Sequence, residues 1–142
     1  MAIFDFPYLC IGFLPEVPAM HLVWKGSATT EEHHLGWDTA LAYAIEHNVT
    51  YWLIDHSKRR VPNPDDTGWL LVNWVPRHRQ ALGPMRGLAL IEAEDALTQL
   101  TTDIVVNQLL TRLPGTVFKY FREFDPAKAW LLSLSAKTPP ST

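Results

Sequence analysis

Histidine and cysteine are the residue types that most often bind metals or act as nucleophiles, and this chain of 142 residues has six histidines and one cysteine. His33 and His34 are adjacent and come directly after Glu31 and Glu32. Adjacent side chains on a helix point about 100° apart, so this pair is poorly placed to chelate one ion. The chain has no His-Glu-x-x-His or paired Cys-x-x-Cys spacing. We therefore predict no metal site here, but a solvated first helical turn.

Motifs for nucleophilic or nucleotide chemistry are also missing from the sequence. Ser57 is not in a Gly-x-Ser-x-Gly turn, and Cys10 lies inside an apolar run where a small core filler is the usual role. No Gly-x-Gly-x-x-Gly or P-loop pattern is present. The paired acids Asp65 and Asp66 suit the start of a helix, where carboxylates complement the helix dipole. The sequence predicts neither an enzyme nor a bound cofactor.

Positive charge is concentrated in one part of the chain. Six of the twelve Lys and Arg residues lie between residues 58 and 86, opposed there only by Asp65 and Asp66. One interpretation is a solvated loop and helix end. The other is a partner-binding or anion-binding patch at Lys58, Arg59 and Arg60, directly after a central strand. The net charge of −3 for the whole chain gives no support for nucleic-acid binding.

Hydrophobic periodicity predicts the elements that must position these residues. Apolar runs bounded by Pro, Gly or Asp indicate strands, and spacings of three and four indicate helices. The predicted order is β-β-α-β-α-β-α-β-α. The strands are expected at 8–14, 20–25, 51–54, 86–91 and 116–121, and the main helices at 29–48, 65–82, 103–113 and from 125, with a short helical turn at 94–100 and a polar loop at 56–64.

These elements fit one domain. We predict an α/β domain at residues 1–137, with a mixed five-stranded sheet covered by about four helices, and a disordered tail at 138–142. A capping box at Thr29 and Glu32 starts the first helix. Pro76 must kink or end the second helix, because proline removes a backbone donor. No apolar run approaches the roughly 20 residues of a membrane helix, so we expect a cytoplasmic protein that binds no membrane.

The six tryptophans are many for a chain of this length. The segment 69–75, Trp-Leu-Leu-Val-Asn-Trp-Val, is apolar nearly all round. Such a helix is either buried on both sides or covers a partner. Trp69 and Trp74 are therefore candidate residues of an interface between two copies of the chain.

One stretch resembles a known family. The strand ending Trp52-Leu53-Ile54-Asp55, followed by a loop and a helix within this order of elements, resembles the STAS domain of anti-sigma-factor antagonists (SpoIIAA-like). It looks most like the small uncharacterised bacterial members. The resemblance implies a regulatory module with a kinase or another regulator as its partner. It also implies a switch hydroxyl before a glycine, which here would be Thr67 in Asp66-Thr67-Gly68, with threonine in place of the family's serine.

Three function classes remain open. The first is a non-catalytic regulatory or protein-interaction module. The second is a carrier of a small molecule or lipid, with a pocket between the helices and the sheet, and the third is an enzyme without a recognised motif. An apolar cavity beneath residues 69–75 would favour the carrier, whereas a solid core would favour the module.

The tryptophan surplus predicts a two-fold dimer, because tryptophan is enriched among interface anchors and two-fold dimers are the commonest soluble oligomers. Light scattering at micromolar concentration should give twice the chain mass of 16.2 kDa. A mass near that of one chain would contradict the prediction.

Overall fold

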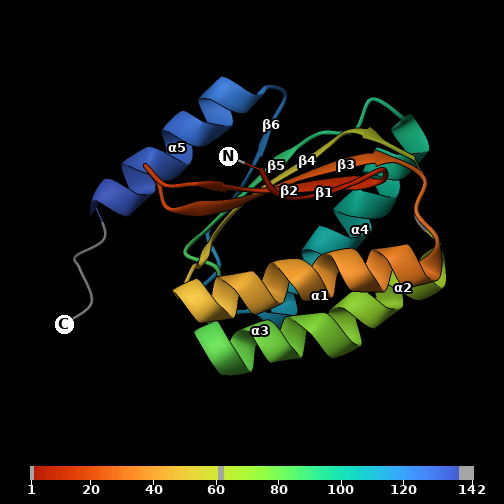
Figure 1. Ribbon diagram of the computed structural model, residues 1–142, viewed down its shortest axis with the longest axis horizontal. Helices are drawn as coiled ribbons and strands as arrows, with labels where there is room; N and C mark the ends of the chain where they lie inside the picture. The colour runs from red at the N-terminus through yellow and green to blue at the C-terminus, as the bar shows by residue number, and fades with distance from the viewer. Residues whose placement is uncertain (1, 61–62, 138–142) are drawn as a thin grey trace.

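A single mixed sheet forms the centre of the protein. The computed structural model describes residues 2–60 and 63–137, so the tail expected at 138–142 lies outside the described residues. The strand order follows the sequence, with β1 to β3 antiparallel and β3 to β6 parallel (Figure 1). The strands are β1 (Ala2–Phe6), β2 (Leu9–Leu14), β3 (Ala19–Gly26), β4 (Tyr51–Arg59), β5 (Gly87–Ile91) and β6 (Phe118–Phe121).

The predicted α/β class and mixed sheet are confirmed, but the sheet has six strands rather than five. The strand that the sequence did not reveal is β1, at the edge of the sheet. Its residues are exposed or half-buried, and Asp5 interrupts its apolar character. It therefore lacks the buried periodicity by which strands are recognised, and it forms by pairing with β2.

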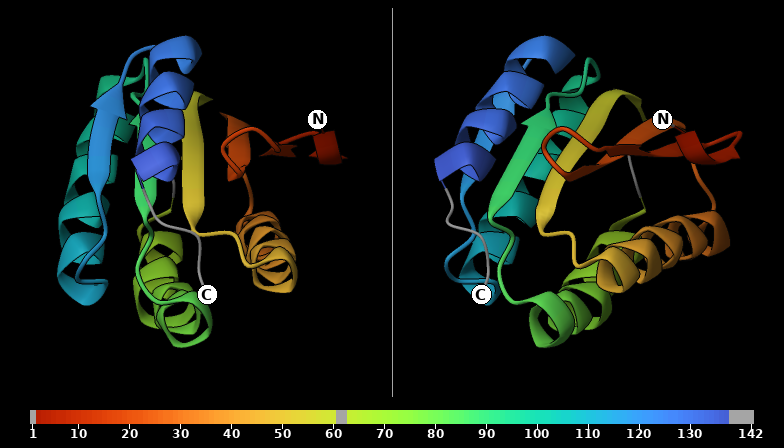
Figure 2. Two further views of the ribbon diagram at one scale, coloured as in Figure 1. Left: turned by 90° about the vertical axis from the view of Figure 1, so that its left-hand side faces the viewer. Right: turned by 60° about the vertical axis from the view of Figure 1, so that its left-hand side comes forward.

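Four helical units cover the sheet in the described residues. The second unit is continuous, running from α2 through a π-helical turn, η1, into α3. Figure 2 shows α5 on one face of the sheet and the other helices on the opposite face. The helices are α1 (Thr30–His47), α2 (Pro64–Trp69), η1 (Leu70–Trp74), α3 (Val75–Leu82), α4 (Ala96–Arg112) and α5 (Phe124–Lys137).

Local signals explain where the helices begin. The capping box of α1 is present as predicted: Thr29 accepts a hydrogen bond from the Glu32 amide, and Glu32 accepts one from the Thr29 amide.

The N-cap of α2 is Asn63, whose side chain accepts a hydrogen bond from the backbone N–H of Asp65. The expectation that Asp65 or Asp66 caps this helix is therefore wrong. The helix passes Pro76 after the π turn, which accommodates the missing proline N–H.

The 94–113 region contains one helix rather than a turn followed by a helix. Asp95 caps α4, accepting hydrogen bonds from both the backbone and the hydroxyl of Thr98 at 2.9 and 2.7 Å. The sequence signal for this cap was weak because exposed Leu97 and Leu100 blur the helical stripe.

The side chains form two cores, one on each face of the sheet. The larger core lies between the sheet and the α1–α4 layer and contains Trp24, Trp37, Trp52 and Trp74. The smaller core lies under α5 and includes Leu53, Ala89 and Leu131. No helix in the described residues is long and apolar enough to cross a membrane.

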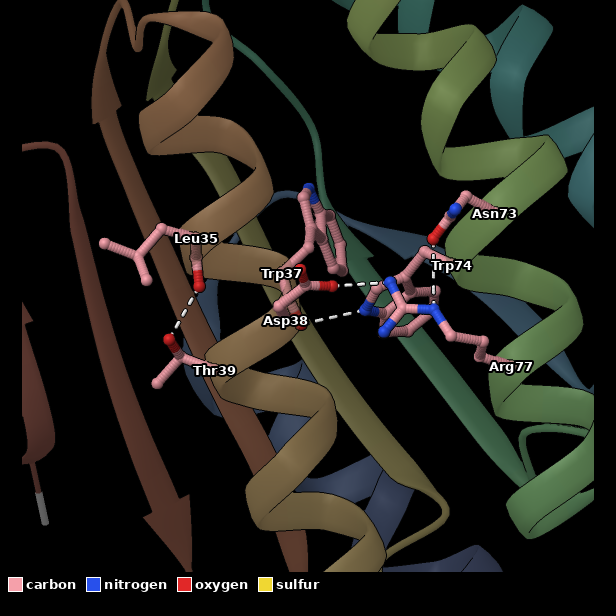
Figure 3. A network of polar contacts seen from close by, with 7 residues as sticks. All are labelled: Leu35, Trp37, Asp38, Thr39, Asn73, Trp74 and Arg77. Atoms are coloured by element: carbon pink, nitrogen blue, oxygen red, sulfur yellow. Dashed lines mark hydrogen bonds and ion pairs between the residues drawn. The ribbon is translucent and has the colours of Figure 1, made fainter.

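Polar contacts fix α1 against the second helical unit (Figure 3). Arg77 forms an ion pair with Asp38 and donates to the side chain of Asn73 at 3.0 Å. Beneath it, the Trp74 indole N–H donates to the backbone oxygen of Trp37 at 2.8 Å. The sequence made Trp74 a candidate for an interface between two copies. Trp74 is fully buried within one chain, so it offers no surface to a second copy. The dimer itself stays a prediction.

The central strand gives the first stability prediction. Leu53 has no exposed surface, and replacing it by alanine should lower the free energy of unfolding by about 2–5 kcal/mol through lost burial and a cavity. The matched control is Val72→Ala, because Val72 is 65% exposed and should change stability by at most about 0.5 kcal/mol. Urea denaturation measures both, and equal losses would contradict the central position of Leu53.

Candidate functional site

A bulge in β4 determines which side chains reach the interior. Between the pairs Val23–Asp55 and Lys25–Lys58, β3 advances by two residues and β4 by three. The extra residue reverses the alternation of the strand, so His56 and Arg59 are both buried while Lys58 is exposed. The polar loop expected at 56–64 is therefore wrong for residues 56–59, which belong to the strand. Residues 61 and 62 lie outside the described part.

A pocket of about 50 Å³ opens between α4, the second helical unit and the sheet. A volume of this size is enough for one or two water molecules, since a water occupies roughly 30 Å³ in the liquid. Its walls are mainly aliphatic, and its polar lining includes His33, His56 and Arg59. The aliphatic walls come from the two central strands and from α4, through Ile54, Leu88, Leu90, Val105, Val106 and Leu109.

The main charge at the pocket is the guanidinium of Arg59. This residue is 6% exposed, and its guanidinium carbon lies 4.5 Å above the ring of Trp24. No carboxylate in the described residues lies within 4.0 Å of it. Burial lowers the pKa of Arg59 to about 10, and nearby Asp66 opposes this shift. Arg59 is thus a buried cation at neutral pH without an ion-pair partner in the described part of the chain.

His56 holds this guanidinium in place. A guanidinium nitrogen of Arg59 lies 3.0 Å from Nε2 of His56. Because arginine can only donate hydrogen bonds, Nε2 must accept. The ring proton is therefore on Nδ1 and is donated to the hydroxyl of Thr102 at 3.2 Å. That hydroxyl donates in turn to the backbone oxygen of Thr98. Burial and the adjacent Arg59 keep the pKa of His56 well below its usual value, so the ring is neutral.

His33 is buried in an aromatic cluster. It is 2% exposed and lies among the rings of Trp24, Trp37 and Trp69. The indole N–H of Trp37 donates to its Nε2 at 3.2 Å. Burial, reinforced by Arg59, lowers the pKa of His33 to about 3. The solvated first helical turn predicted for this position is therefore wrong for His33.

Asp66 brings a carboxylate to the two adjacent histidines. Donor atoms of His33, His34 and Asp66 all lie within 4.8 Å of one another. Asp66 is 2% exposed, and the ring of His34 stacks on Trp69 at 3.9 Å. The sequence argument against a metal site considered only His33 and His34, which are adjacent on α1 and point in different directions. It could not reveal that α2 places a third donor beside them.

The predicted basic patch is divided between two sides of β4. Arg59 points inward, whereas Lys58 and Arg60 are exposed. Lys58 forms an ion pair with Glu94 at 2.7 Å, and Arg60 lies 3.9 Å from Asp95. Strand alternation and the bulge cause this division. These five residues and Ser57 line a shallow surface depression of about 360 Å³.

The other predicted site residues lie beside the pocket. Thr67 is half-buried at the pocket, and its hydroxyl donates to the backbone oxygen of Pro64 at 2.8 Å. Trp69 is half-buried against His34. No observation tests whether Thr67 is a switch hydroxyl, so this role stays a prediction.

Comparison with known proteins decides the fold. No protein-family model matches the chain, and no curated protein matches it significantly. A solved structure does, with a TM-score of 0.60 and 19% sequence identity over 87% of this chain and 91% of the other. It is an uncharacterized protein of the DUF3478 family from Shewanella loihica PV-4, with a SpoIIAA-like fold. The fold of this chain is SpoIIAA-like.

The SpoIIAA-like fold confirms the resemblance to STAS domains at the level of architecture. At 19% identity the likeness carries the fold alone. The likeness does not assign a ligand to the pocket.

Buried neutral histidines predict how stability depends on pH. The folded-state pKa is about 3 for His33 and about 4 for His78, where burial is the main cause, whereas an unfolded histidine titrates near 6.5. Below pH 6.5 the unfolded chain therefore binds protons that the folded chain does not. Stability should fall with decreasing pH from about 6.5 to about 4, by up to about 1.4 kcal/mol per pH unit for each such histidine.

Urea denaturation between about pH 7 and pH 4.5 measures this slope. His33→Gln keeps an acceptor for the indole N–H of Trp37. It should reduce the slope of stability against pH by the contribution of about one proton. His47→Gln, at an exposed position, serves as the surface control. Identical slopes in wild type and His33→Gln would contradict the buried neutral state.

Proposed function

We propose that this protein is a non-catalytic binding protein whose pocket takes a small molecule with an apolar body and a carboxylate group. The observation that carries the proposal is the buried guanidinium of Arg59, which lines an otherwise mainly aliphatic pocket without an ion-pair partner among the described residues. A buried cation without a direct ion pair is costly, even with the Asp66 carboxylate nearby, and a carboxylate is the group that best matches its paired N–H donors.

The surroundings of Arg59 favour a bound anion. His56 accepts from one guanidinium nitrogen, so the side chain is oriented before any ligand arrives. Trp24 covers one face of the guanidinium plane, so the N–H donors at its edge are the groups left for a ligand. Orientation in advance reduces the entropy that binding must overcome.

The pocket dimensions favour a short apolar body. Its volume of about 50 Å³ suits a chain of few carbon atoms. A surface groove of about 320 Å³ between α2 and α4 shares Thr67, Thr101 and Val105 with the pocket. A longer chain could therefore extend from Arg59 along this groove, past Leu71 and Ile104.

A regulatory or protein-interaction role is the second candidate. The observation in its favour is an exposed apolar row on α4, formed by Leu97, Leu100 and Ile104, each more than half exposed. Ile104 also lines the groove. A ligand in the pocket and a protein on this row would be close to each other, so the two roles are compatible.

The Arg59→Met variant tests the carboxylate proposal. NMR titrations with butyrate and hexanoate should show saturable shifts at pocket residues, and the uncharged hexanol should bind more weakly. Arg59→Met should weaken hexanoate binding about tenfold or more, because hydrogen bonds to charged groups contribute about 1.5–3 kcal/mol. Arg60→Met is the matched control, since Arg60 is exposed and directly follows Arg59 at the end of β4.

A second variant addresses the case in which Arg59→Met does not fold. Val105→Phe adds bulk where the pocket meets the groove and should weaken hexanoate binding while Arg59 stays in place. Absence of carboxylate binding by the wild type, or equal binding by wild type and both variants, would reject the proposal.

A further inference from the structure

We propose that His33, His34 and Asp66 form a binding site for a divalent transition-metal ion of the zinc class. The site combines two adjacent histidines of α1 with a carboxylate of α2. It does not rest on the carboxylate pocket, because none of these three residues supplies the anion-binding group.

The donor atoms are close enough for one ion. They lie within 4.8 Å of one another, whereas bonds of about 2.0–2.2 Å in a tetrahedral site place donors roughly 3.4 Å apart. Closing this difference needs small side-chain rotations. His34 is half-buried and stacked on Trp69, so its ring can turn without leaving the core empty.

Two unsatisfied atoms point to a ligand at this cluster. Nδ1 of His33 and Oδ1 of Asp66 are buried and have no hydrogen-bond partner within the described part of the chain. Both residues are 2% exposed, so bulk water does not solvate these atoms well. Buried polar groups are almost always satisfied in native proteins, and one ion between the two residues would satisfy both atoms.

The donor set selects the class of metal. Two imidazoles and one carboxylate suit zinc, cobalt or nickel, whereas magnesium and calcium prefer oxygen ligands throughout. Three protein ligands leave a coordination position for water or a small anion. Protons compete little for His33, since burial already keeps its ring neutral at pH 7.

Trp37 opposes metal binding at His33. Its indole N–H donates to Nε2, so Nδ1 carries the ring proton in the free protein. An ion at Nδ1 displaces that proton, and the bound neutral ring then carries a proton on Nε2, facing the indole N–H. Metal binding must therefore break the hydrogen bond between Trp37 and His33. Removing this indole N–H should strengthen the binding of the metal.

Arg59 also opposes a cation. Its charge acts on both His33 and Asp66, so a divalent ion at the cluster is repelled by it. Replacing Arg59 by an uncharged residue should therefore strengthen metal binding. The same change weakens carboxylate binding under the proposed function, so one variant gives opposite signs at the two sites.

The test uses the untagged full chain with Co²⁺ and Zn²⁺ alone. Co²⁺ should produce the visible absorption of a four- or five-coordinate ion with a 1:1 end point, and Zn²⁺ should displace it. Asp66→Asn and His34→Ala should each weaken binding about tenfold or more. The controls are Asp65→Asn and His47→Ala, exposed residues of the same types, which should bind as the wild type does.

The remaining outcomes separate this site from others. Arg59→Met and Trp37→Phe should bind Zn²⁺ more tightly than the wild type, even where their melting temperature is lower. His34 is half-buried, so His34→Ala should fold and stays decisive if Asp66→Asn does not. Wild-type protein without cobalt absorption, or equal affinity in wild type and His34→Ala, would overturn the proposal. Carboxylate binding in the same samples would still report on the other site.

Discussion

The one extra residue of β4 determines the chemistry of this protein. Without the bulge between Asp55 and Lys58, strand alternation would turn Lys58 inward and Arg59 outward. With it, a guanidinium enters the core, where it needs an aromatic surface and an acceptor. Trp24 supplies the aromatic surface and His56 the acceptor.

The aromatic core imposes a second constraint, because a buried indole N–H gains stability from an acceptor, and Trp24 is the buried tryptophan that finds none among the described residues. Histidine meets this need twice: Trp37 donates to His33, and Trp52 donates to His78 at 3.1 Å. A histidine that accepts in this way must be neutral at that nitrogen, and burial keeps the pKa of both rings low. Two of the tryptophans and two of the buried histidines therefore form paired units of the core.

The sequence predicted the elements with strong local patterns and missed those that depend on distant contacts. The capping box of α1 and the apolar run 51–54 were sufficient signals, and both are confirmed. The edge strand β1 and the bulge in β4 could not be predicted, since each depends on a neighbouring strand. Asp66 looked like a helix-start residue because its burial against α1 is a tertiary contact.

The polar groups around the pocket are difficult to explain by stability alone. Well-packed hydrophobic residues in place of a buried charge are often neutral or stabilising, and aliphatic residues already line most of this pocket. Instead the interior holds Arg59 without an ion-pair partner, and Asp66 and His33 each keep an unsatisfied atom among the described residues. Each unsatisfied group lowers the stability of the free protein, and each is a group that a ligand of opposite character can satisfy. The electrostatic cost borne by the free fold is thus the source of affinity, because a ligand that satisfies these groups recovers it on binding.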